Sequence, residues 1–326
     1  MTAPVSLPLY FGKLPSRGDF VRSSTGSALI RSLDAWMSQT MDLLAQDTRW
    51  KLIYDAAAPV HFAIIGPHTR AGLVGHLAVS QDTSGRRFPF VLAAALDMPK
   101  PASLIPYCPQ GLVPIWTRFD LGVREAMASM DFGAIQKDLV ARSVEVGREW
   151  KALQDSYDQF AREQTLASVE SMLSQPDRPF SFRQTALALG LLLQPVLQRG
   201  ATNPDKGIWL PLPSEPAHMA HAITLWVGLV ARFFTKTSAE IALFVTSHRG
   251  LPVLVMGFHG ASAATLRSVL DADACATDNI AVGDADWVED WIGTEVPLRR
   301  LSNLLRDPQL SVATAARMFF DTFLGE

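Results

Sequence analysis

Three short apolar runs separated by tight turns constrain the fold of this chain more than any other feature. The runs are Pro59–Ile65, Ala71–Val79 and Phe88–Leu96, and turn-forming residues stand between them around Gly66 and Gly85. Runs of this length and composition are typical of β-strands. Because the connections are so short, the sequence predicts an antiparallel meander in the first third of the chain.

Helical periodicity flanks these strands. From Ser27 to Gln46, apolar residues recur at three- and four-residue intervals, as expected for a helix with one buried face. A short strand is predicted at Leu7–Lys13, and the proline-rich residues Pro99–Pro114 are expected to break the pattern before a helix from about Trp116 to Met130. Residues 1–140 are therefore predicted to form an α/β domain with a largely antiparallel sheet and flanking helices.

Residues 141–326 are predicted to form a second α/β domain that is rich in helices and ends in a helical segment. The expected helices are Glu149–Leu173, Phe182–Gln198 and Ala217–Phe234, and the expected strands are Ile208–Leu212, Ile241–Thr246 and Pro252–Phe258. Asp307 and Pro308 are expected to begin the last helix, since Asp caps free amides and Pro suits the first helical position. The fold class predicted for the whole chain is mixed α+β.

Composition narrows the classes of function. The chain has 326 residues, 48% of them hydrophobic, which is enough for a globular protein with a large core. A net charge of -3 without a basic run argues against nucleic-acid binding. The N-terminus lacks the basic region of a secretory signal, and the longest apolar runs are too short to cross a bilayer. A cytoplasmic protein that does not insert into membranes is therefore expected.

Candidate catalytic residues each lack a needed partner. Ser262, in the sequence Gly-Ala-Ser-Ala-Ala after an apolar strand, loosely imitates a nucleophile elbow, but His259 is the last histidine in the chain. In that motif an acid and then a histidine should follow the serine, and the histidine is missing from that order. Ser262 is expected instead to cap a helix.

Metal and nucleotide motifs are similarly incomplete. His61, His68 and His76 are widely spaced, and although a hairpin could bring two together, no zinc site is expected. Cys108 and Cys275 are too few for a disulfide framework or a zinc ribbon. The acidic stretch from about residue 271 to 290 does not match a calcium loop, and no phosphate loop is present. We predict no catalytic, cofactor-binding or metal-binding residues and no enzymatic activity.

Two short segments carry a more specific signal. The first, residues 11–21, reads Phe-Gly-Lys-Leu-Pro-Ser-Arg-Gly-Asp-Phe-Val, and the second, residues 80–90, reads Ser-Gln-Asp-Thr-Ser-Gly-Arg-Arg-Phe-Pro-Phe. Both resemble signature segments of the TagF or ImpM family of bacterial type VI secretion accessory proteins. The candidate site residues are Gly12, Lys13, Pro15, Ser16, Arg17, Gly18, Asp19, Phe20, Ser80, Asp82, Gly85, Arg86, Arg87, Phe88 and Pro89.

These motifs have a structural and a functional interpretation. In the structural one, Pro15 and Gly18 fix a bend and Asp19 accepts backbone amides at the turn. In the functional one, a charged patch docks a partner; its residues would be Lys13, Arg17, Asp19, Arg86 and Arg87. We expect the two motifs to lie side by side, with Asp19 paired to Arg86 or Arg87 through a bidentate contact.

The family resemblance implies a non-enzymatic accessory protein. It implies post-translational repression of type VI secretion through binding of a forkhead-associated-domain component. An assembly factor or chaperone of the secretion apparatus is the alternative, and a hydrolase that uses Ser262 or the acidic stretch is a third possibility. Some family members are fused to a metal-dependent phosphatase domain, whose Arg-Gly-x-x-Arg and Asp-Gly motifs are not found here, so the stand-alone form is expected.

Overall fold

One nine-stranded sheet organises the chain. In the computed structural model, which describes residues 7–141, 150–175, 179–198 and 202–325, the strand order is β2-β1-β5-β4-β3-β7-β8-β6-β9. The strands are β1 Leu9–Gly12, β2 Val21–Arg22, β3 Val60–Gly66, β4 Thr69–Ala78, β5 Phe90–Asp97, β6 Gly207–Pro211, β7 Ile241–His248, β8 Leu251–Gly257 and β9 Asn279–Ala281. Neighbouring strands are antiparallel except for the β6–β9 pair. The predicted antiparallel meander is confirmed as β3-β4-β5.

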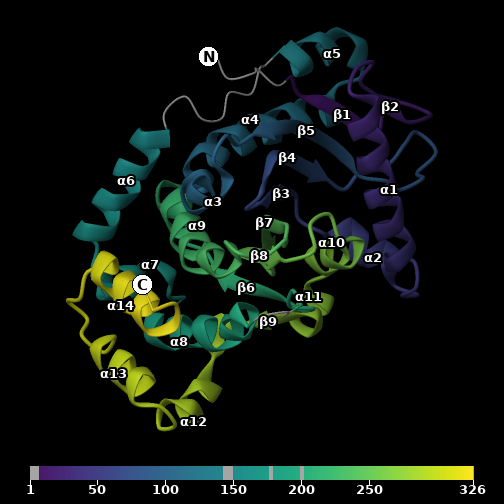
Figure 1. Ribbon diagram of the computed structural model, residues 1–326. Helices are drawn as coiled ribbons and strands as arrows, with labels where there is room; N and C mark the ends of the chain where they lie inside the picture. Colours follow the sequence, from purple (N-terminus) through teal and green to yellow (C-terminus); the bar gives the residue numbers. More distant parts are fainter. Residues whose placement is uncertain (1–6, 142–149, 176–178, 199–201, 326) are drawn as a thin grey trace.

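Helices cover both faces of this sheet (Figure 1). Their bounds are α1 Ser27–Leu44, α2 Trp50–Ala56, α3 Pro101–Leu104, α4 Cys108–Ala128, α5 Phe132–Ala141, α6 Trp150–Glu163, α7 Leu166–Leu173, α8 Phe182–Leu193, α9 Pro216–Ala231, α10 Ala263–Leu270, α11 Ala272–Asp278, α12 Glu289–Ile292, α13 Val296–Leu304 and α14 Val312–Phe323. The mixed α+β class predicted from the sequence is confirmed.

Successive side chains of each strand point to opposite faces of the sheet, and this alternation places a hydrophobic layer on each face. In β3, Phe62 packs on one face with residues of α1 and α10, while Ala63 and Ile65 pack on the other face with residues of α4 and α9. The same alternation runs through β7 and β8. Two hydrophobic cores therefore lie on opposite sides of the sheet.

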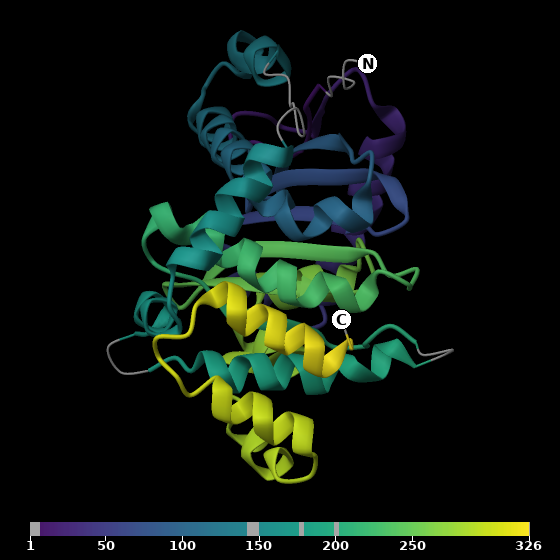
Figure 2. The same cartoon turned by 60° about the vertical axis from the view of Figure 1, so that its left-hand side comes forward.

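Strands from both predicted domains meet in the middle of this sheet. β3 pairs with β7, and the indole Nε1 of Trp36 in α1 donates to the carbonyl oxygen of Ser262 at 3.1 Å. Figure 2 shows the N-terminal elements at one end of the molecule and the C-terminal helices α12 and α13 at the other. The boundary between residues 140 and 141 remains a prediction, while the sheet is shared by both segments.

The predicted start of one helix was wrong, because the prolines before it were expected to prevent a helix. The helix expected from Trp116 begins at Cys108 instead, after a first turn at Pro101–Leu104 and a 3₁₀ turn at Ile105–Tyr107. Pro109 sits in the first turn of α4, where its missing N–H costs nothing. Pro114 lies inside the helix, so it does not end the element as expected.

Two helix boundaries in the second half of the chain were also mispredicted. The last helix begins at Val312 rather than at Pro308, because Ser311 caps it by accepting the amide of Thr314. The Asp307 carboxylate instead accepts the amide of Gln309 within a turn, at 2.9 Å. The helix expected over Glu149–Leu173 is divided in two by Thr165, whose hydroxyl begins α7 in a capping box; residue 149 lies outside the described residues.

Among the described residues, the segment Pro216–Phe234, which contains α9, has the length and apolarity of a membrane-crossing helix. Its side chains are mostly buried inside the protein, as is typical of a central core helix.

Candidate functional site

The two motifs lie against each other at one end of the sheet. We use the name motif junction for residues 11–21, which run from β1 to β2, together with residues 80–90, which connect β4 to β5. The Ser80 hydroxyl donates to the Lys13 carbonyl at 2.7 Å, and the Thr83 amide donates to the Arg17 carbonyl at 3.0 Å. The expectation that the motifs lie side by side is therefore confirmed.

Asp82 is the centre of the motif junction. Its side chain is fully buried, and the ammonium of Lys13, itself only 6% exposed, lies 3.0 Å from Oδ2. Oδ1 accepts the amides of Ser84 and Arg86 at 2.9 and 3.0 Å. Burial by itself would raise the pKa of the Asp82 carboxyl, but the donors from Arg86, Lys13 and Ser84 hold it well below its usual range. Asp82 is therefore a buried anion that closes the second motif and fastens it to the first.

The arginines of the second motif take partners other than the predicted one. Arg86 donates through Nε to Asp82 at 2.7 Å and through Nη2 to the Gly18 carbonyl at 2.7 Å. Arg87 forms a bidentate pair with Asp55, at 2.7 and 2.6 Å. The carboxylate of Asp19 instead accepts the neighbouring amide of Phe20 at 2.8 Å. The expected pairing of Asp19 with an arginine is wrong, because nearer carboxylates satisfy both guanidinium groups.

Helix α2, which sequence reasoning missed, supplies two further residues of the site. The hydroxyl of Tyr54 both donates to the Ser80 carbonyl and accepts the Ser80 amide, at 3.0 and 2.9 Å. Burial raises the pKa of Tyr54 well above its usual value. Residues 54 and 55 lie about thirty positions from the second motif, so their spacing gives no signal that they contact it.

Aromatic rings form the outer part of the motif junction. Phe20, 42% exposed, stacks on Phe11 with ring centroids 5.5 Å apart and packs edge-on against Phe88 at 4.9 Å. The Lys13 ammonium lies 5.0 Å from the Phe20 ring centroid, in a cation–π contact. An exposed aromatic side chain is therefore held in a fixed position by buried neighbours.

Gly12 makes the close approach of the motifs possible. Its φ is +131°, and a Cβ at this position would lie 2.0 Å from the Pro89 carbonyl oxygen. Gly85 has a φ of +74° at the turn of the second motif. Both glycines are therefore required by the backbone. Gly18, to which the structural interpretation assigned the bend, has no positive φ, and an added Cβ there would lie 3.5 Å from Thr83 Oγ1, which is an ordinary contact.

The candidate residues divide by exposure. Those that are buried are Gly12, Lys13, Ser80, Asp82, Phe88 and Pro89; those half-buried are Ser16, Arg17 and Arg87; and those exposed are Pro15, Gly18, Asp19, Phe20, Gly85 and Arg86. Lys13 therefore belongs to the internal network and not to the surface patch expected from the sequence.

Other residues singled out in the sequence take structural positions. Ser262 accepts the amide of Thr265 and caps α10, as expected. Three of the acidic residues after it form ion pairs, Asp273 with Arg249, Asp278 with Arg267 and Glu289 with Arg183. In the described part of the chain, no group of three or more His, Cys, Asp or Glu side chains could hold a metal ion.

His61 and His76 do meet across the β3–β4 hairpin. Their Nδ1 atoms lie 2.8 Å apart, so one ring donates and the other accepts. Burial lowers the pKa of His61 to about 4 and that of His76 to about 2. His76 Nε2 lies 3.4 Å from Asp120, and His61 stacks on Trp116. The pair is therefore neutral near pH 7 and belongs to the core.

Comparison with known proteins identifies the domain that contains the motif junction. Residues 10–117 match the family model described as the TagF N-terminal domain, type VI secretion system-associated. No curated protein matches the chain. A solved structure, described as the crystal structure of PA0076 from Pseudomonas aeruginosa PAO1, is similar at 18% identity over 81% of this chain and 94% of that chain, with a TM-score of 0.35. Residues 10–117, which contain both motifs, are therefore assigned as a TagF N-terminal domain, a domain associated with the type VI secretion system.

Proposed function

We propose that this protein is a cytoplasmic, post-translational negative regulator of type VI secretion that acts by binding a forkhead-associated-domain component. The association with type VI secretion rests on the TagF domain. Repression and the identity of the partner are what the family resemblance implies. Binding, and not bond making, is the proposed mode of action.

The observation that carries this proposal is the way the motif junction divides into a buried frame and an exposed surface. Asp82, Lys13 and Ser80 lie inside and fix the two loops against each other. Phe20 and Arg86 are exposed on the outside, and Arg17 is half-buried beside them. Aromatic side chains and arginine are the residue types that most often dominate binding energy at protein interfaces.

The rigidity of this surface favours binding. The Phe20 ring is held between Phe11 and Phe88, and Arg86 is fixed by its hydrogen bonds to Asp82 and the Gly18 carbonyl. A surface ordered in advance loses little side-chain entropy when a partner docks. By occupying a surface of its partner, the protein would shift that partner between active and inactive assemblies.

The test is a titration of the purified protein with its cognate forkhead-associated-domain protein, by calorimetry at micromolar concentrations. We expect a saturable complex that is weakened at least about tenfold by Phe20→Ala combined with Arg17→Gln, since truncation of such residues commonly costs 1–2 kcal/mol or more. Arg299→Gln, on exposed α13 at the other end of the molecule, is the matched control and should bind as the wild type does (Figure 1).

The two variants must first be shown to melt at the temperature of the wild-type protein. Failure to form any complex would count against the proposed partner. Equal affinity of the double variant and the wild type would exclude the motif junction as the contact surface.

A further inference from the structure

A pocket lies at the end of the sheet away from the motif junction. Strand β6, the turn of the β7–β8 hairpin and helix α11 border a space of about 300 Å³, and Figure 1 shows β6 and α11 close to the edge strand β9. The lining residues run from Leu173 to Asp284, so none belongs to the motif junction or to the matched domain. We use the name hairpin pocket for this space.

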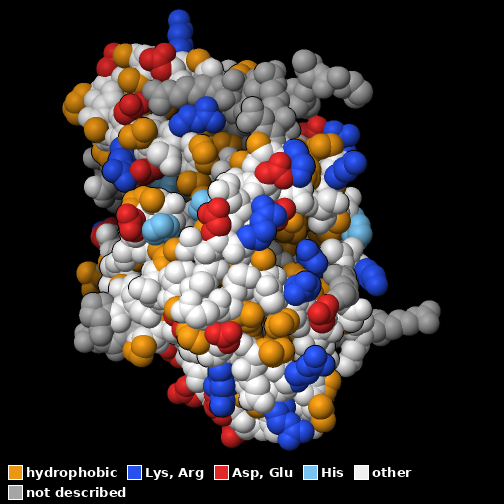
Figure 3. Space-filling model, turned by 90° about the vertical axis from the view of Figure 1, so that its left-hand side faces the viewer, with side chains coloured by type: hydrophobic (Ala, Val, Ile, Leu, Met, Phe, Trp, Pro, Cys, Tyr) orange, Lys and Arg blue, Asp and Glu red, His pale blue; other side chains and the backbone are white. Residues whose placement is uncertain are grey.

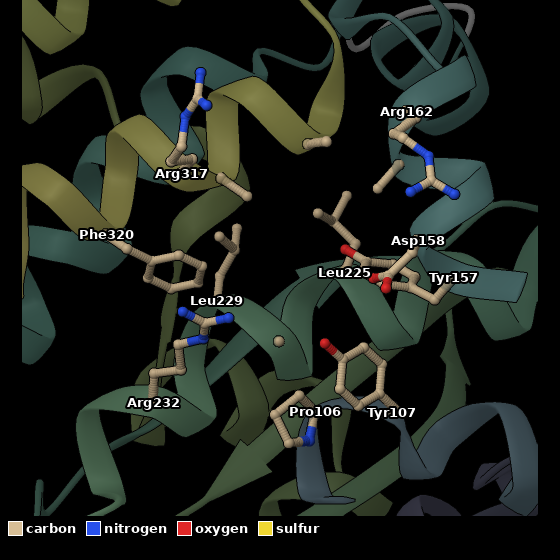
Figure 4. A pocket seen from close by; sticks show the side chains of 14 residues that line it. Pro106, Tyr107, Tyr157, Asp158, Arg162, Leu225, Leu229, Arg232, Arg317 and Phe320 are labelled. Atoms are coloured by element: carbon tan, nitrogen blue, oxygen red, sulfur yellow. The ribbon is translucent and has the colours of Figure 1, made fainter. Parts of the chain in front are cut away.

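A larger pocket, about 480 Å³ in volume, lies between α6, α9 and α14 (Figure 4). Arg162, Arg232 and Arg317 line it from three different elements. Figure 3 shows Lys and Arg side chains beside hydrophobic ones on the side of the molecule that carries α6. The hairpin pocket differs from it in the position of its charged residues, which stand only at its mouth.

The inner walls of the hairpin pocket are apolar. Phe180, Leu212 and Cys275 line them and are buried. Burial raises the pKa of the Cys275 thiol to about 11, so this side chain is uncharged near pH 7. Half-buried Trp209 of β6 adds a second aromatic side chain, and three prolines add further apolar ring surface. The interior is therefore built largely from flat apolar groups.

The mouth of the hairpin pocket carries its charges. Among the described lining residues the charged ones are Arg249 and Asp284, and both are exposed. Leu251 and Ala276, which are also exposed, mark the opening to solvent. Because a charge buried without a partner is costly, the interior suits an uncharged group, and polar substituents would remain in water at the mouth.

Contacts within the protein hold the mouth in place. Arg249 and Gly250 have φ values of +52° and +81°, as a two-residue hairpin turn requires. Arg249 donates through Nη2 to Asp273 of α11 at 2.7 Å, and His248 Nε2 donates to the carbonyl oxygen of Val269 in α10 at 2.9 Å. The hairpin tip is therefore fixed against α10 and α11 without a ligand, which lowers the entropy cost of binding.

We propose that the hairpin pocket binds a small uncharged aromatic molecule of one or two rings, which lies against Phe180 and Trp209. An apolar cavity of about 150 Å³ binds benzene, so about 300 Å³ has room for two fused rings. Aromatic pairs add stabilisation beyond the apolar area that they bury. Ala272 and Ala276, four residues apart on one face of α11, both line the pocket, and their small side chains leave this room.

This site is independent of the proposed regulatory surface, because the two share no residue. Loss of partner binding at the motif junction would leave the ligand proposal standing, and the reverse also holds.

The test uses the full chain and two probes, indole and 2-naphthol, titrated by calorimetry at pH 7. We expect at least one of them to bind saturably with a dissociation constant below about 1 mM. Decahydro-2-naphthol, which has the size of 2-naphthol without its aromatic rings, should bind more weakly. Naphthalene-2,6-disulfonate has a charge at each end, so one charge would enter the apolar interior, and its binding should be at least tenfold weaker.

Two kinds of variant locate the binding. Ala272→Leu combined with Ala276→Leu fills the pocket and should weaken binding at least tenfold. Ala264→Leu, at an exposed position of α10 that does not line the pocket, is the matched control and should leave affinity unchanged. Trp209→Leu leaves the space open but removes one aromatic wall, so it should weaken binding of indole independently of the alanine variants. Melting temperatures equal to that of the wild type show that each variant is folded.

Three results would overturn the proposal. The first is no saturable binding of either probe up to about 5 mM, well above the expected dissociation constant. The second is binding that is unaffected by both the alanine pair and Trp209→Leu. The third is equal affinity for 2-naphthol, its saturated analogue and the disulfonate, which would show contact with the surface and not entry into an apolar aromatic pocket.

Discussion

The motif junction and the pocket between α6, α9 and α14 use arginine in different ways. At the junction, Arg86 and Arg87 find carboxylates of this chain at hydrogen-bonding distance. In the pocket, Arg162 and Arg317 have no such partner in the described residues. The paired arginines hold two loops and a helix together, whereas Arg162 and Arg317 hold no such contact.

The glycines of the two regions also differ in their surroundings. Gly12 at the motif junction is enclosed by the backbone of Pro89, while Gly228 in the pocket faces open space. The first glycine allows close packing and the second preserves a cavity. Sequence alone does not distinguish them, since both are single glycines within apolar stretches.

Substitution of these two glycines should give the largest contrast. Gly12→Ala places a side chain at positive φ against the Pro89 carbonyl, and we expect a loss of about 3 kcal/mol or more of unfolding free energy. Gly228→Ala should be neutral or should stabilise α9 by up to about 1 kcal/mol. Urea denaturation of both variants checks this, and a Gly12→Ala protein as stable as the wild type would contradict the packing described for the junction.

Removal of the central anion should have the next largest effect. Asp82→Asn leaves the buried Lys13 ammonium without its carboxylate and weakens the turn hydrogen bonds, so the melting temperature should fall by roughly 10 °C. Arg162→Gln in the pocket breaks no ion pair, so this variant should change the melting temperature by no more than about 2 °C. Equal changes in melting temperature for the two variants would contradict the view that paired charges stabilise the fold more than unpaired ones.

A pH series separates the motif junction from the core histidines. The folded-state pKa of His61 is lowered to about 4, so the unfolded chain takes up protons first as the pH falls below about 6.5. Stability should therefore decline between pH 6.5 and 5, by about 2 kcal/mol for this histidine, and His76 should add to the loss. Replacing both histidines with leucine should flatten the curve in this range.

Asp82 should affect the stability of the fold at lower pH than the two histidines do. Because its folded-state pKa is held below the usual value, its contribution is present above about pH 4 and is lost as the pH falls further. The double histidine variant should keep this acid-induced loss, and Asp82→Asn should reduce it. Identical pH curves for the wild type and the double histidine variant would show that the histidine pair is not buried as described.

The smallest effect is expected at the outer ion pair of the motif junction. Asp55→Asn breaks the bidentate contact with Arg87, but the Asp55 side chain is 50% exposed. Exposed pairs of this kind contribute at most about 1 kcal/mol, and salt screens them. Chemical denaturation should show that Asp55→Asn has a slightly smaller free energy of unfolding than the wild type at low salt. At high salt the two proteins should be equally stable.

The sequence predicted the parts of this molecule that depend on local pattern. The turn residues between strands gave the meander β3-β4-β5, and the order of residues in the second motif placed its turn at Gly85. Ser262 was recognised as a helix cap because its chemistry is local.

Contacts between distant segments could not be predicted in the same way. The pairing of β3 with β7, the hydrogen bonds of Tyr54 to Ser80 and the choice of Asp82 as partner for Arg86 all depend on tertiary packing. The pocket between α6, α9 and α14 gave no sequence signal, because its three arginines come from segments 70 to 85 residues apart. A helix containing Pro114 also contradicted the usual rule that proline ends a helix.

The central claim, repression through the exposed surface of the motif junction, is tested most directly by deleting the gene and measuring type VI secretion into the culture medium. We predict that secretion rises in the deletion strain, returns to its original level with the wild-type gene, and stays high with Phe20→Ala combined with Arg17→Gln. A fall in secretion after deletion would contradict the account, because it would indicate an assembly factor and not a repressor.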